Sequence, residues 1–452
     1  MADKARILTA KALMRVSAGG FSNLVLDSLL EENHLEQRDR AFVSALFYGV
    51  LERRITLDTL IRKYVTQPFD KISPEVLETL RMGFYQILYM NSVPDNAAVN
   101  ESVELVKNLG VAKASGFVNG VLRSFIRDGK KADFSYLKGI RRLSAEYSAP
   151  LWLCEKWCLE FGPQRTQKAL RASIGAPPIY VRVNTEKITA EELKKTLEAE
   201  GISVSETDIL PTALILDSAA PQNTKAYEAG LFHVQDISSQ LCALAVGAKE
   251  NERVLDVCAA PGGKSFTVAE YMKNTGELIA CDLHPKRANL VKTGGERLGL
   301  TNISAKANDA VIYKEELGTF NRILCDVPCS GLGVIRRKPE IRFKKPEDLT
   351  SLPKIQYKIA STSARYLKDG GTLIYSTCTL SKEENEEVVR RLIEENGLVP
   401  ENLPEELQKY SSDGYSVTLL PGEINSDAFF FARLKKEVKD FGSSLFDLWK
   451  TL

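Results

Sequence analysis

The sequence predicts a multidomain protein, with an all-α bundle first, a small α+β domain next and an α/β domain last. Three observations carry this prediction. Apolar residues recur at helical spacing up to about residue 140, short alternating segments occupy 141–230, and strands alternate with helices over 231–440. A chain of 452 residues is long enough for two or three domains of ordinary size.

The first domain, residues 1–140, is predicted to be a compact helical bundle. Apolar side chains recur at helical spacing in ILTAKALMRV, LVLDSLLEENHL, RAFVSALFYGVLERRI and EVLETLRMGFYQILYM. No sustained alternation of apolar and polar residues, which would be typical of strands, interrupts these segments. The pattern therefore predicts helices that each bury one face against their neighbours.

The second domain, residues 141–230, has a mixed pattern. Residues 179–185 (IYVRVNT) alternate like a strand, and residues 188–201 predict a helix that ends at a glycine. ISVSETD and ALILD then predict two short strands. We therefore expect a small α+β domain.

The third domain, residues 231–440, repeats strand and helix in turn. Strands are predicted at RVLDVCA, ELIACD, RILCDV, TLIYST and FFFARLKK. Helices are predicted from Ser265, near 285–298, at KIQYKIASTSARYL and at KEENEEVVRRLIEEN. Such alternation predicts a mainly parallel, doubly wound sheet.

Composition excludes several classes of protein. Lys and Arg number 60 against 59 Asp and Glu, so nucleic-acid binding would depend on local basic surface. No apolar run approaches the roughly 18–20 residues of a membrane helix, and the amphipathic start does not resemble a secretory signal. Eight cysteines without a C-x-x-C pair predict reduced thiols and a cytoplasmic location. Only three histidines are present, so we expect neither a metal site nor a Ser-His-Asp triad.

A glycine-containing segment, Asp256 to Ser265 (DVCAAPGGKS), joins a predicted strand to a predicted helix. Gly262 and Gly263 let the backbone turn tightly and approach a ligand, and ligands of open α/β sheets bind beyond the carboxyl ends of strands. A phosphate-binding P-loop would need a glycine where Cys258 stands, and the G-x-G-x-x-G spacing of a dinucleotide site is absent. An adenosyl cofactor without a diphosphate needs neither motif.

Acidic residues follow the next strands in turn. Asp282 ends a strand 19 positions after Gly263, where a carboxylate can hydrogen-bond ribose hydroxyls. Asp309 follows a further short strand, where it can bind an adenine amino group or the cationic portion of the cofactor. One such aspartate is as often a helix cap or a solvated loop residue. Several of them, spaced one per strand, favour a ligand site.

Two cysteines are predicted at the same edge of the sheet. Cys329 lies in the segment DVPCSG and Cys378 in YSTCT, each just after a predicted strand. A lone cysteine is more often a buried small hydrophobe than a nucleophile. That interpretation is favoured for Cys154, Cys158, Cys242, Cys281 and Cys325. The strand-end positions of Cys329 and Cys378 favour a chemical role instead.

Cytosine chemistry explains why a thiol would be placed there. Carbon 5 of cytosine is too weak a nucleophile to take a methyl group, but addition of a thiolate to carbon 6 makes carbon 5 enamine-like. Asp326 can hold the base by its ring nitrogen and exocyclic amine, once the base is unstacked.

A basic segment follows Cys329. Residues 336–345 (RRKPEIRFKK) hold six basic residues and one acidic residue, a local charge of +5. Charge runs are usually solvated faces, but this run adjoins the predicted pocket, which favours contact with RNA phosphates. Arg336, Arg337 and Lys338 are the predicted RNA-binding residues.

Together these segments resemble a known family. DVCAAPGGKS, ACDLHPKR, ANDA, DVPCSGLGVIRRKPEIRF, YSTCTLSKEENEEVV and the DAFFFARL end are similar to motifs of RNA cytosine-5 methyltransferases, which have a Rossmann-like fold and depend on S-adenosylmethionine (SAM). DRAFVSALFYGVLERRITLD and AVNESVELVK…FVNGVLRSF are similar to the helical NusB-type RNA-binding domain. This domain order resembles the bacterial RsmB (Sun/Fmu) family, which methylates one cytosine of small-subunit (16S) ribosomal RNA.

The resemblance implies a role for each matching position. The residues implied to bind SAM are Cys258, Ala259, Ala260, Pro261, Gly262, Gly263, Lys264, Asp282, Asp309 and Asp326. Cys378, in the Thr-Cys motif, is implied to be the nucleophile, and Cys329, in the Pro-Cys motif, to assist product release. DNA cytosine methyltransferases use the Pro-Cys cysteine as nucleophile and carry a Glu-Asn-Val motif, which is absent here.

We therefore expect a monomeric SAM-dependent enzyme that methylates carbon 5 of a cytosine in ribosomal RNA through a covalent cysteine intermediate. Two alternatives stay open: a transfer-RNA cytosine-5 methyltransferase and an inactive RNA-binding assembly factor. The NusB-like front favours ribosomal RNA by analogy, and the intact loop with two cysteines disfavours the inactive factor. A P-loop ATPase is a distant third.

Overall fold

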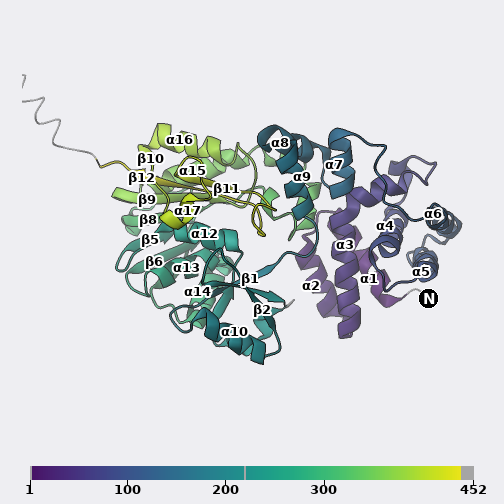
Figure 1. Ribbon diagram of the computed structural model, residues 1–452, viewed down its shortest axis with the longest axis horizontal. Coiled ribbons are helices and arrows are strands. Elements are labelled where there is room, and N and C mark those ends of the chain that lie inside the picture. Colours follow the sequence, from purple (N-terminus) through teal and green to yellow (C-terminus); the bar gives the residue numbers. More distant parts are fainter. Residues whose placement is uncertain (1–2, 218–219, 439–452) are drawn as a thin grey trace, which may run out of the picture. The chain divides into compact units, whose positions relative to one another are not determined.

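The computed structural model describes residues 3–217 and 220–438 (Figure 1). The outermost residues of the predicted domains 1–140 and 231–440 therefore lie outside the described residues. The chain divides into two compact units. The helical unit comprises Met1–Gly175 and Ile335–Pro346, and the sheet unit comprises Ala176–Val334 and Glu347–Leu452.

In the helical unit, helices from α1 to α7 pack around a shared apolar core, as the helical periodicity predicts. Phe84 of α4 stacks on Phe125 of α6 with ring centroids 4.3 Å apart, and Phe47 of α3 is fully buried in the same core. The last three helices span residues 139–172, almost all of which were predicted as part of the α+β domain 141–230, and they lie within the helical unit. The helices are α1 (Lys4–Ser17), α2 (Ser22–Asn33), α3 (Gln37–Ile61), α4 (Pro74–Tyr89), α5 (Asp95–Asn108), α6 (Ser115–Arg127), α7 (Gly139–Tyr147), α8 (Leu151–Phe161) and α9 (Pro163–Ala172).

A short segment from much later in the chain, Ile335–Pro346, completes the helical unit. Its Arg342 is only 1% exposed and donates hydrogen bonds to the backbone carbonyls of Tyr147, Ser148 and Ser173 at 3.1, 3.1 and 2.7 Å. Ser22 donates to Glu340 Oε2 at 2.7 Å. The segment is therefore fastened to the bundle by buried polar contacts as well as by packing.

The sheet unit begins with a small antiparallel sheet of order β2-β3-β1-β4. Val181, Leu214 and Phe232 from three of its strands are buried with Leu193 and Leu197 of the helix α10. This confirms the strand predicted at 179–185 and the helix predicted at 188–201. The elements are β1 (Ile179–Val183), α10 (Ala190–Ala199), β2 (Ser203–Glu206), β3 (Ala213–Asp217), α11 (Lys225–Glu228) and β4 (Phe232–Val234).

A larger sheet of eight strands follows, in the order β10-β12-β9-β8-β5-β6-β7 with β11 paired to β12 (Figure 1). The pairs among β5, β6, β7, β8 and β9 are parallel, whereas β12 runs antiparallel to its neighbours. The predicted mainly parallel, doubly wound sheet is confirmed, with a late antiparallel addition. The strands are β5 (Arg253–Asp256), β6 (Glu277–Asp282), β7 (Ile303–Ala307), β8 (Phe320–Asp326), β9 (Leu367–Thr377), β10 (Leu398–Pro400), β11 (Ser416–Leu419) and β12 (Phe429–Lys436). The helices are α12 (Ile237–Val246), α13 (Gly263–Tyr271), α14 (Pro285–Leu298), α15 (Leu352–Ala364), α16 (Glu386–Asn396) and α17 (Glu405–Gln408).

Strand register brings the predicted functional residues to one edge of this sheet. Asp256 is the last residue of β5, Asp282 of β6 and Asp326 of β8, and Asp326 pairs in register with Ser376 of β9. Parallel strands end at a common edge, so the loops that leave them face the same space. Within the described ranges, no helix has the length and apolar character needed to cross a membrane.

Candidate active site

The loop between β5 and α13 is shaped by one glycine and one buried carboxyl group. Gly262 adopts a φ of 115°, and a Cβ at this position would lie 2.3 Å from the ring of Phe266. Asp256 accepts hydrogen bonds from the Ser265 hydroxyl at 2.7 Å and from the Cys258 backbone N–H at 3.3 Å. The loop therefore closes on the carboxyl group at the end of β5.

Asp256 has a shifted pKa because its carboxyl group is buried. Burial raises its pKa to about 7, although the hydrogen bond from Ser265 opposes the rise. The nearby charge of Asp326 adds to the rise.

A pocket of about 180 Å³ lies beside this loop. Three carboxyl groups (Asp236, Asp256 and Asp326) and one ammonium group, that of Lys264, line it. This balance favours a ligand with cationic or hydrogen-donating groups over a phosphate. The lining residues are Val234, Gln235, Asp236, Ser239, Asp256, Cys258, Ala259, Ala260, Pro261, Gly263, Lys264 and Asp326.

Asp282 and Asp309 follow adjacent strands but do not line this pocket. Asp282 is buried and accepts from the His284 backbone N–H at 3.1 Å, with Arg287 Nε 3.3 Å from its other oxygen. Asp309 accepts from the Val311 backbone N–H at 3.1 Å. Both carboxylates are thus held in place by local backbone contacts at the ends of β6 and β7.

Lys264 and Asp326 form an ion pair across the site. Lys264 Nζ lies 2.7 Å from Asp326 Oδ2, and the other carboxylate oxygen accepts from the Ser376 hydroxyl at 2.9 Å. Burial alone would lower the pKa of Lys264, but the charge of Asp326, the hydrogen bond to it and the nearby thiols of Cys242 and Cys378 together outweigh burial, and the pKa is raised. Lys264 therefore stays charged, and it also interacts electrostatically with the Cys378 thiol.

The two cysteines predicted at the sheet edge meet directly. Cys329 Sγ lies 3.2 Å from Cys378 Sγ, within hydrogen-bonding distance for sulfur. The contact with Cys378 and then burial raise the pKa of Cys329 well above its ordinary value. Cys329 is therefore a protonated thiol that can donate toward the sulfur of Cys378.

Polar contacts hold the two cysteine loops together. The hydroxyls of Ser330 and Thr379 lie 2.6 Å apart, and the Gly333 backbone N–H donates to the Cys378 carbonyl at 3.0 Å. Glu384 accepts from the Ser330 backbone N–H at 2.9 Å and from Gln356 at 2.8 Å. These contacts fix the 3.2 Å approach of the thiols from both sides.

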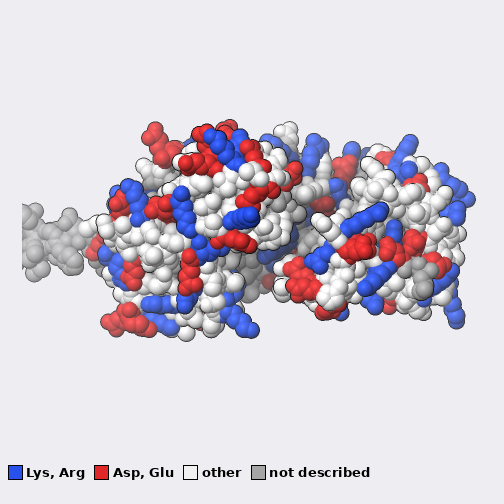
Figure 2. Space-filling model, turned by 90° about the horizontal axis from the view of Figure 1, so that it is seen from below, with Lys and Arg blue, Asp and Glu red and all other residues white. Residues whose placement is uncertain are grey.

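The basic segment after Cys329 is only partly available to a polyanion. Arg336 donates through Nε to the Gly175 carbonyl at 3.1 Å, Arg337 is half-buried and Lys338 is exposed. Arg342, which contributes to the local charge of +5, is buried among backbone carbonyls. Figure 2 shows basic and acidic side chains interspersed over the face in view, consistent with the net charge of +1.

Two residues that line the pocket, Gln235 and Asp236, were not predicted from the sequence. Gln235 and Asp236 line the pocket from the junction of β4 and α12, and Asp236 caps α12 through the Ser238 backbone N–H at 3.0 Å. A capped helix directly after a short strand is the signal that could have found them. In the part of the chain that the structure describes, no cluster of three or more His, Cys, Asp or Glu could hold a metal ion.

Three comparisons place this geometry among known proteins. Residues 243–435 match the family described as 16S rRNA methyltransferase RsmB/F, residues 3–127 match the NusB family, and residues 149–223 match the ferredoxin-like domain of RsmF/B-like methyltransferases. The probable ribosomal RNA small subunit methyltransferase B of Bacillus subtilis is 38% identical over 442 residues, which cover 96% of this chain and 98% of that protein. The chain belongs to the RsmB/F family of 16S rRNA methyltransferases.

Other relatives agree with this assignment. The ribosomal RNA small subunit methyltransferase B of Cronobacter sakazakii is 32% identical over 439 residues, covering 96% of this chain and 98% of that protein. The crystal structure of NSun6 from Pyrococcus horikoshii with SFG has a TM-score of 0.58 and 23% identity, and it covers 63% of this chain and 97% of its own, which shows the shared fold. The fold class predicted from sequence, a NusB-like bundle followed by a small α+β domain and a methyltransferase α/β domain, is confirmed. This RsmB/F family member is an rRNA methyltransferase.

Proposed function

We propose that this chain transfers a methyl group from SAM to carbon 5 of one cytosine in 16S rRNA, through a covalent bond between Cys378 and the base. The observation that carries the proposal is the thiol pair. Two sulfurs 3.2 Å apart, beside a partly buried lysine–carboxylate pair at the carboxyl edge of a parallel sheet, suit addition and elimination of a thiol at a base.

SAM suits the loop and its surroundings. The pocket presents three carboxyl groups against one lysine, and the turn at Gly262 leaves no room for a side chain. The loop Cys258–Lys264, with Asp282, Asp309 and Asp326, would hold the cofactor. When bound, SAM supplies an electrophilic methyl group on a sulfonium. The structure of NSun6 with SFG, a SAM analogue, supports this assignment through the shared fold.

The chain's own residues perform the remaining steps. Lys264, which stays charged, favours the thiolate of Cys378 and so its addition to carbon 6. Asp326 accepts a hydrogen bond from the exocyclic amine of the unstacked base, and a second from ring nitrogen 3 once that nitrogen has taken up a proton as the thiolate adds to carbon 6. After methyl transfer, water takes the carbon-5 proton, the carbon 5–carbon 6 double bond re-forms, and Cys378 Sγ leaves as a thiolate. Cys329, a thiol beside Cys378, assists this release.

Recognition of RNA is assigned to both units. We assign phosphate contacts to Arg336, Arg337 and Lys338, which follow the Pro-Cys motif, and broader RNA binding to the NusB-like bundle. We propose that the enzyme acts as a monomer and in the cytoplasm, where its ribosomal RNA substrate is.

The experiment that tests the proposal is methyl transfer to protein-free 16S rRNA, with the modified base located by bisulfite sequencing. One newly protected cytosine would establish the reaction. Protection of transfer RNA in place of 16S rRNA would contradict the substrate assignment and leave the chemistry intact.

Cysteine variants test the covalent step. Cys378→Ala is expected to abolish methylation, and Cys329→Ala to accumulate a covalent enzyme–RNA adduct that survives denaturing electrophoresis. Cys158→Ala removes a half-buried thiol of α8 and is the matched control, expected to change neither. Activity retained by Cys378→Ala but lost in Cys329→Ala would reverse the two roles.

A further inference from the structure

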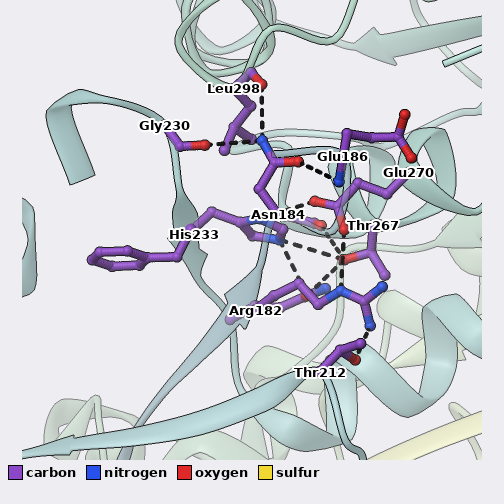
Figure 3. A network of polar contacts seen from close by, with 12 residues as sticks. Arg182, Asn184, Glu186, Thr212, Gly230, His233, Thr267, Glu270 and Leu298 are labelled. Carbon is purple, nitrogen blue, oxygen red and sulfur yellow. Dashed lines mark hydrogen bonds and ion pairs between the residues drawn. The ribbon is translucent and has the colours of Figure 1, made fainter. Parts of the chain in front are cut away.

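A chain of buried polar side chains joins the small sheet to the helix that follows the cofactor loop (Figure 3). Arg182 comes from β1, His233 from β4, and Thr267 and Glu270 from α13. Gln235 directly follows β4 and is 6% exposed. All five side chains are buried, so their contacts are made away from water.

The contacts link these side chains in sequence, and two of them converge on Gln235. Arg182 Nε donates to Glu270 Oε2 at 3.2 Å, and the Thr267 hydroxyl donates to Gln235 Oε1 at 2.7 Å. His233 Nε2 lies 3.3 Å from the same Gln235 oxygen and acts as a donor to it. Its Nδ1 must then be an acceptor, because a neutral imidazole carries only one N–H.

One link of the chain requires a proton. His233 Nδ1 and Glu270 Oε1 lie 3.8 Å apart, and both are buried without a hydrogen-bond partner. Burial raises the pKa of Glu270 to about 7 and lowers that of His233 to about 3. Below pH 7 the proton therefore resides on Glu270, 3.8 Å from the neutral imidazole of His233. Without it, two buried acceptors would face each other.

At its other end, this series of buried polar side chains reaches the cofactor loop. Thr267 Oγ1 lies 3.1 Å from the Gly263 carbonyl, and a Cβ built on Gly263 would lie 3.6 Å from Gln235 Cγ. The ring of Phe266, which packs against Gly262, meets the His233 ring edge-on at 5.6 Å. Gln235 and Gly263 both line the pocket. One hydrogen-bonding contact and the close packing of Gln235 and Phe266 thus link these side chains to the backbone that would cradle a ligand.

We propose that Arg182 and Glu270 are positioning residues, which act through His233, Thr267 and Gln235 to hold the Gly262–Gly263 turn in its ligand-binding shape. The inference rests on the proposed binding of SAM at this loop. It gives the small α+β domain a role in cofactor affinity, although none of its β1 residues lines the pocket.

If Arg182 and Glu270 only stabilise the fold, their loss should affect stability and not the affinity for the cofactor. A buried ion pair is by itself weak evidence of stabilisation. Asn184 offers a matched control on the same small domain. It is fully buried, its side chain donates to the carbonyls of Gly230 and Leu298, both at 2.9 Å, and it accepts from the Glu186 backbone N–H at 3.2 Å (Figure 3), but none of these partners lines the pocket. Loss of Asn184 should therefore destabilise the protein without changing the turn.

The test is calorimetric titration of the full chain with S-adenosylhomocysteine, with thermal unfolding of each variant measured in parallel. Glu270→Leu and Thr267→Val are expected to weaken binding by about 3- to 30-fold, the range of a coupling of 0.5–2 kcal/mol. Glu270→Gln keeps an acceptor for Arg182 and gains an N–H for His233, so it should retain the affinity at pH 6. Asn184→Ala should lower Tm but leave affinity unchanged.

A pH profile separates positioning from packing. The charged and titratable groups around Glu270 are Arg182 of β1, His233 of β4, Glu186 after β1, and Arg297 of α14, which acts on His233. As pH rises above 7, wild-type affinity should fall while that of Glu270→Gln changes less. If Glu270→Leu does not fold, this pH profile still distinguishes a positioning role of Glu270 from a packing role.

The outcomes are distinguishable. Equal affinity loss in Asn184→Ala and Thr267→Val, or parallel pH profiles for the wild type and Glu270→Gln, would overturn the positioning role. A wild-type protein that does not bind S-adenosylhomocysteine would instead refute the proposed cofactor.

Discussion

Replacement of Arg342 by methionine tests how the segment Ile335–Pro346 is fastened to the helical unit. The guanidinium donates to three backbone carbonyls, those of Tyr147, Ser148 and Ser173. Methionine has a similar length and no donor. Arg342→Met therefore removes all three hydrogen bonds and leaves two helix-terminal turns with unpaired carbonyls.

Two opposing quantities set the size of the effect. Hydrogen bonds from a charged donor contribute roughly 1.5–3 kcal/mol each. Burial lowers the pKa of Arg342 from 12.5 to about 10, so the charged form is disfavoured by about 3 kcal/mol, which methionine recovers. The difference is a loss of about 3 kcal/mol in the free energy of unfolding of the helical unit. For a unit of this size, Tm should fall by about 6–12 °C.

Hydrogen exchange with mass spectrometry locates the effect, because a two-unit protein need not unfold in one step. Peptides covering residues 139–175 and 335–346 should exchange faster in Arg342→Met, while those covering β5 and α13 should not change. Lys338→Met in the same segment is the control, since Lys338 is exposed and should shift stability by less than about 0.5 kcal/mol. Unchanged exchange in both regions would refute the view that Arg342 fastens the segment.

Three further predictions concern the sheet unit. Gly262→Ala should lower the free energy of unfolding by about 1–3 kcal/mol and weaken S-adenosylhomocysteine binding, because its Cβ would overlap Phe266. Gly201→Ala is the control for backbone strain alone, since Gly201 has a φ of 82° and open space around its Cβ position. Equal losses of stability for the two variants in calorimetry would contradict the steric argument. Asp326→Asn should reduce the rate of single-turnover methylation by about 100-fold or more, because Lys264 loses its charged partner and the base loses its carboxylate acceptor. Near-normal turnover would show that Asp326 has no part in the mechanism. Glu270 has a pKa raised from 4.5 to about 7, so its contribution to stability is present below pH 4.5 and lost as pH rises to 7. Glu270→Gln should therefore gain up to about 3 kcal/mol relative to the wild type over that window in denaturant titrations, and a constant difference would refute the shift.

Much of this architecture was predictable because it depends on local pattern. The strand ending at Asp256, the turn at Gly262 and the next strand ending at Asp282 each show in a short window of sequence. Once a parallel sheet is inferred, the common edge of its strands follows, and so does the proximity of Cys329 and Cys378. Their 3.2 Å contact depends on register, which no window reveals.

Other features depend on contacts between distant segments. The pairing of Lys264 with Asp326 joins residues 62 positions apart. The charge of each residue does not indicate which oppositely charged residue it will pair with. Arg342 lies in a strongly basic run, which predicts a solvated face, yet it is buried because carbonyls at helix ends provide acceptors. The chain from Arg182 to Gln235 follows no hydrophobic period at all, so periodicity could not find it.

The dependence of the helical unit on Ile335–Pro346 has a consequence for synthesis on the ribosome. That segment emerges 160 residues after Gly175, which is about 8–30 s of translation. During this interval the bundle has its nine N-terminal helices but lacks the side chain that pairs with the carbonyls of Tyr147, Ser148 and Ser173. The first part of the chain to be made is therefore among the last to be finished, and a nascent chain halted before residue 335 carries an incomplete helical unit.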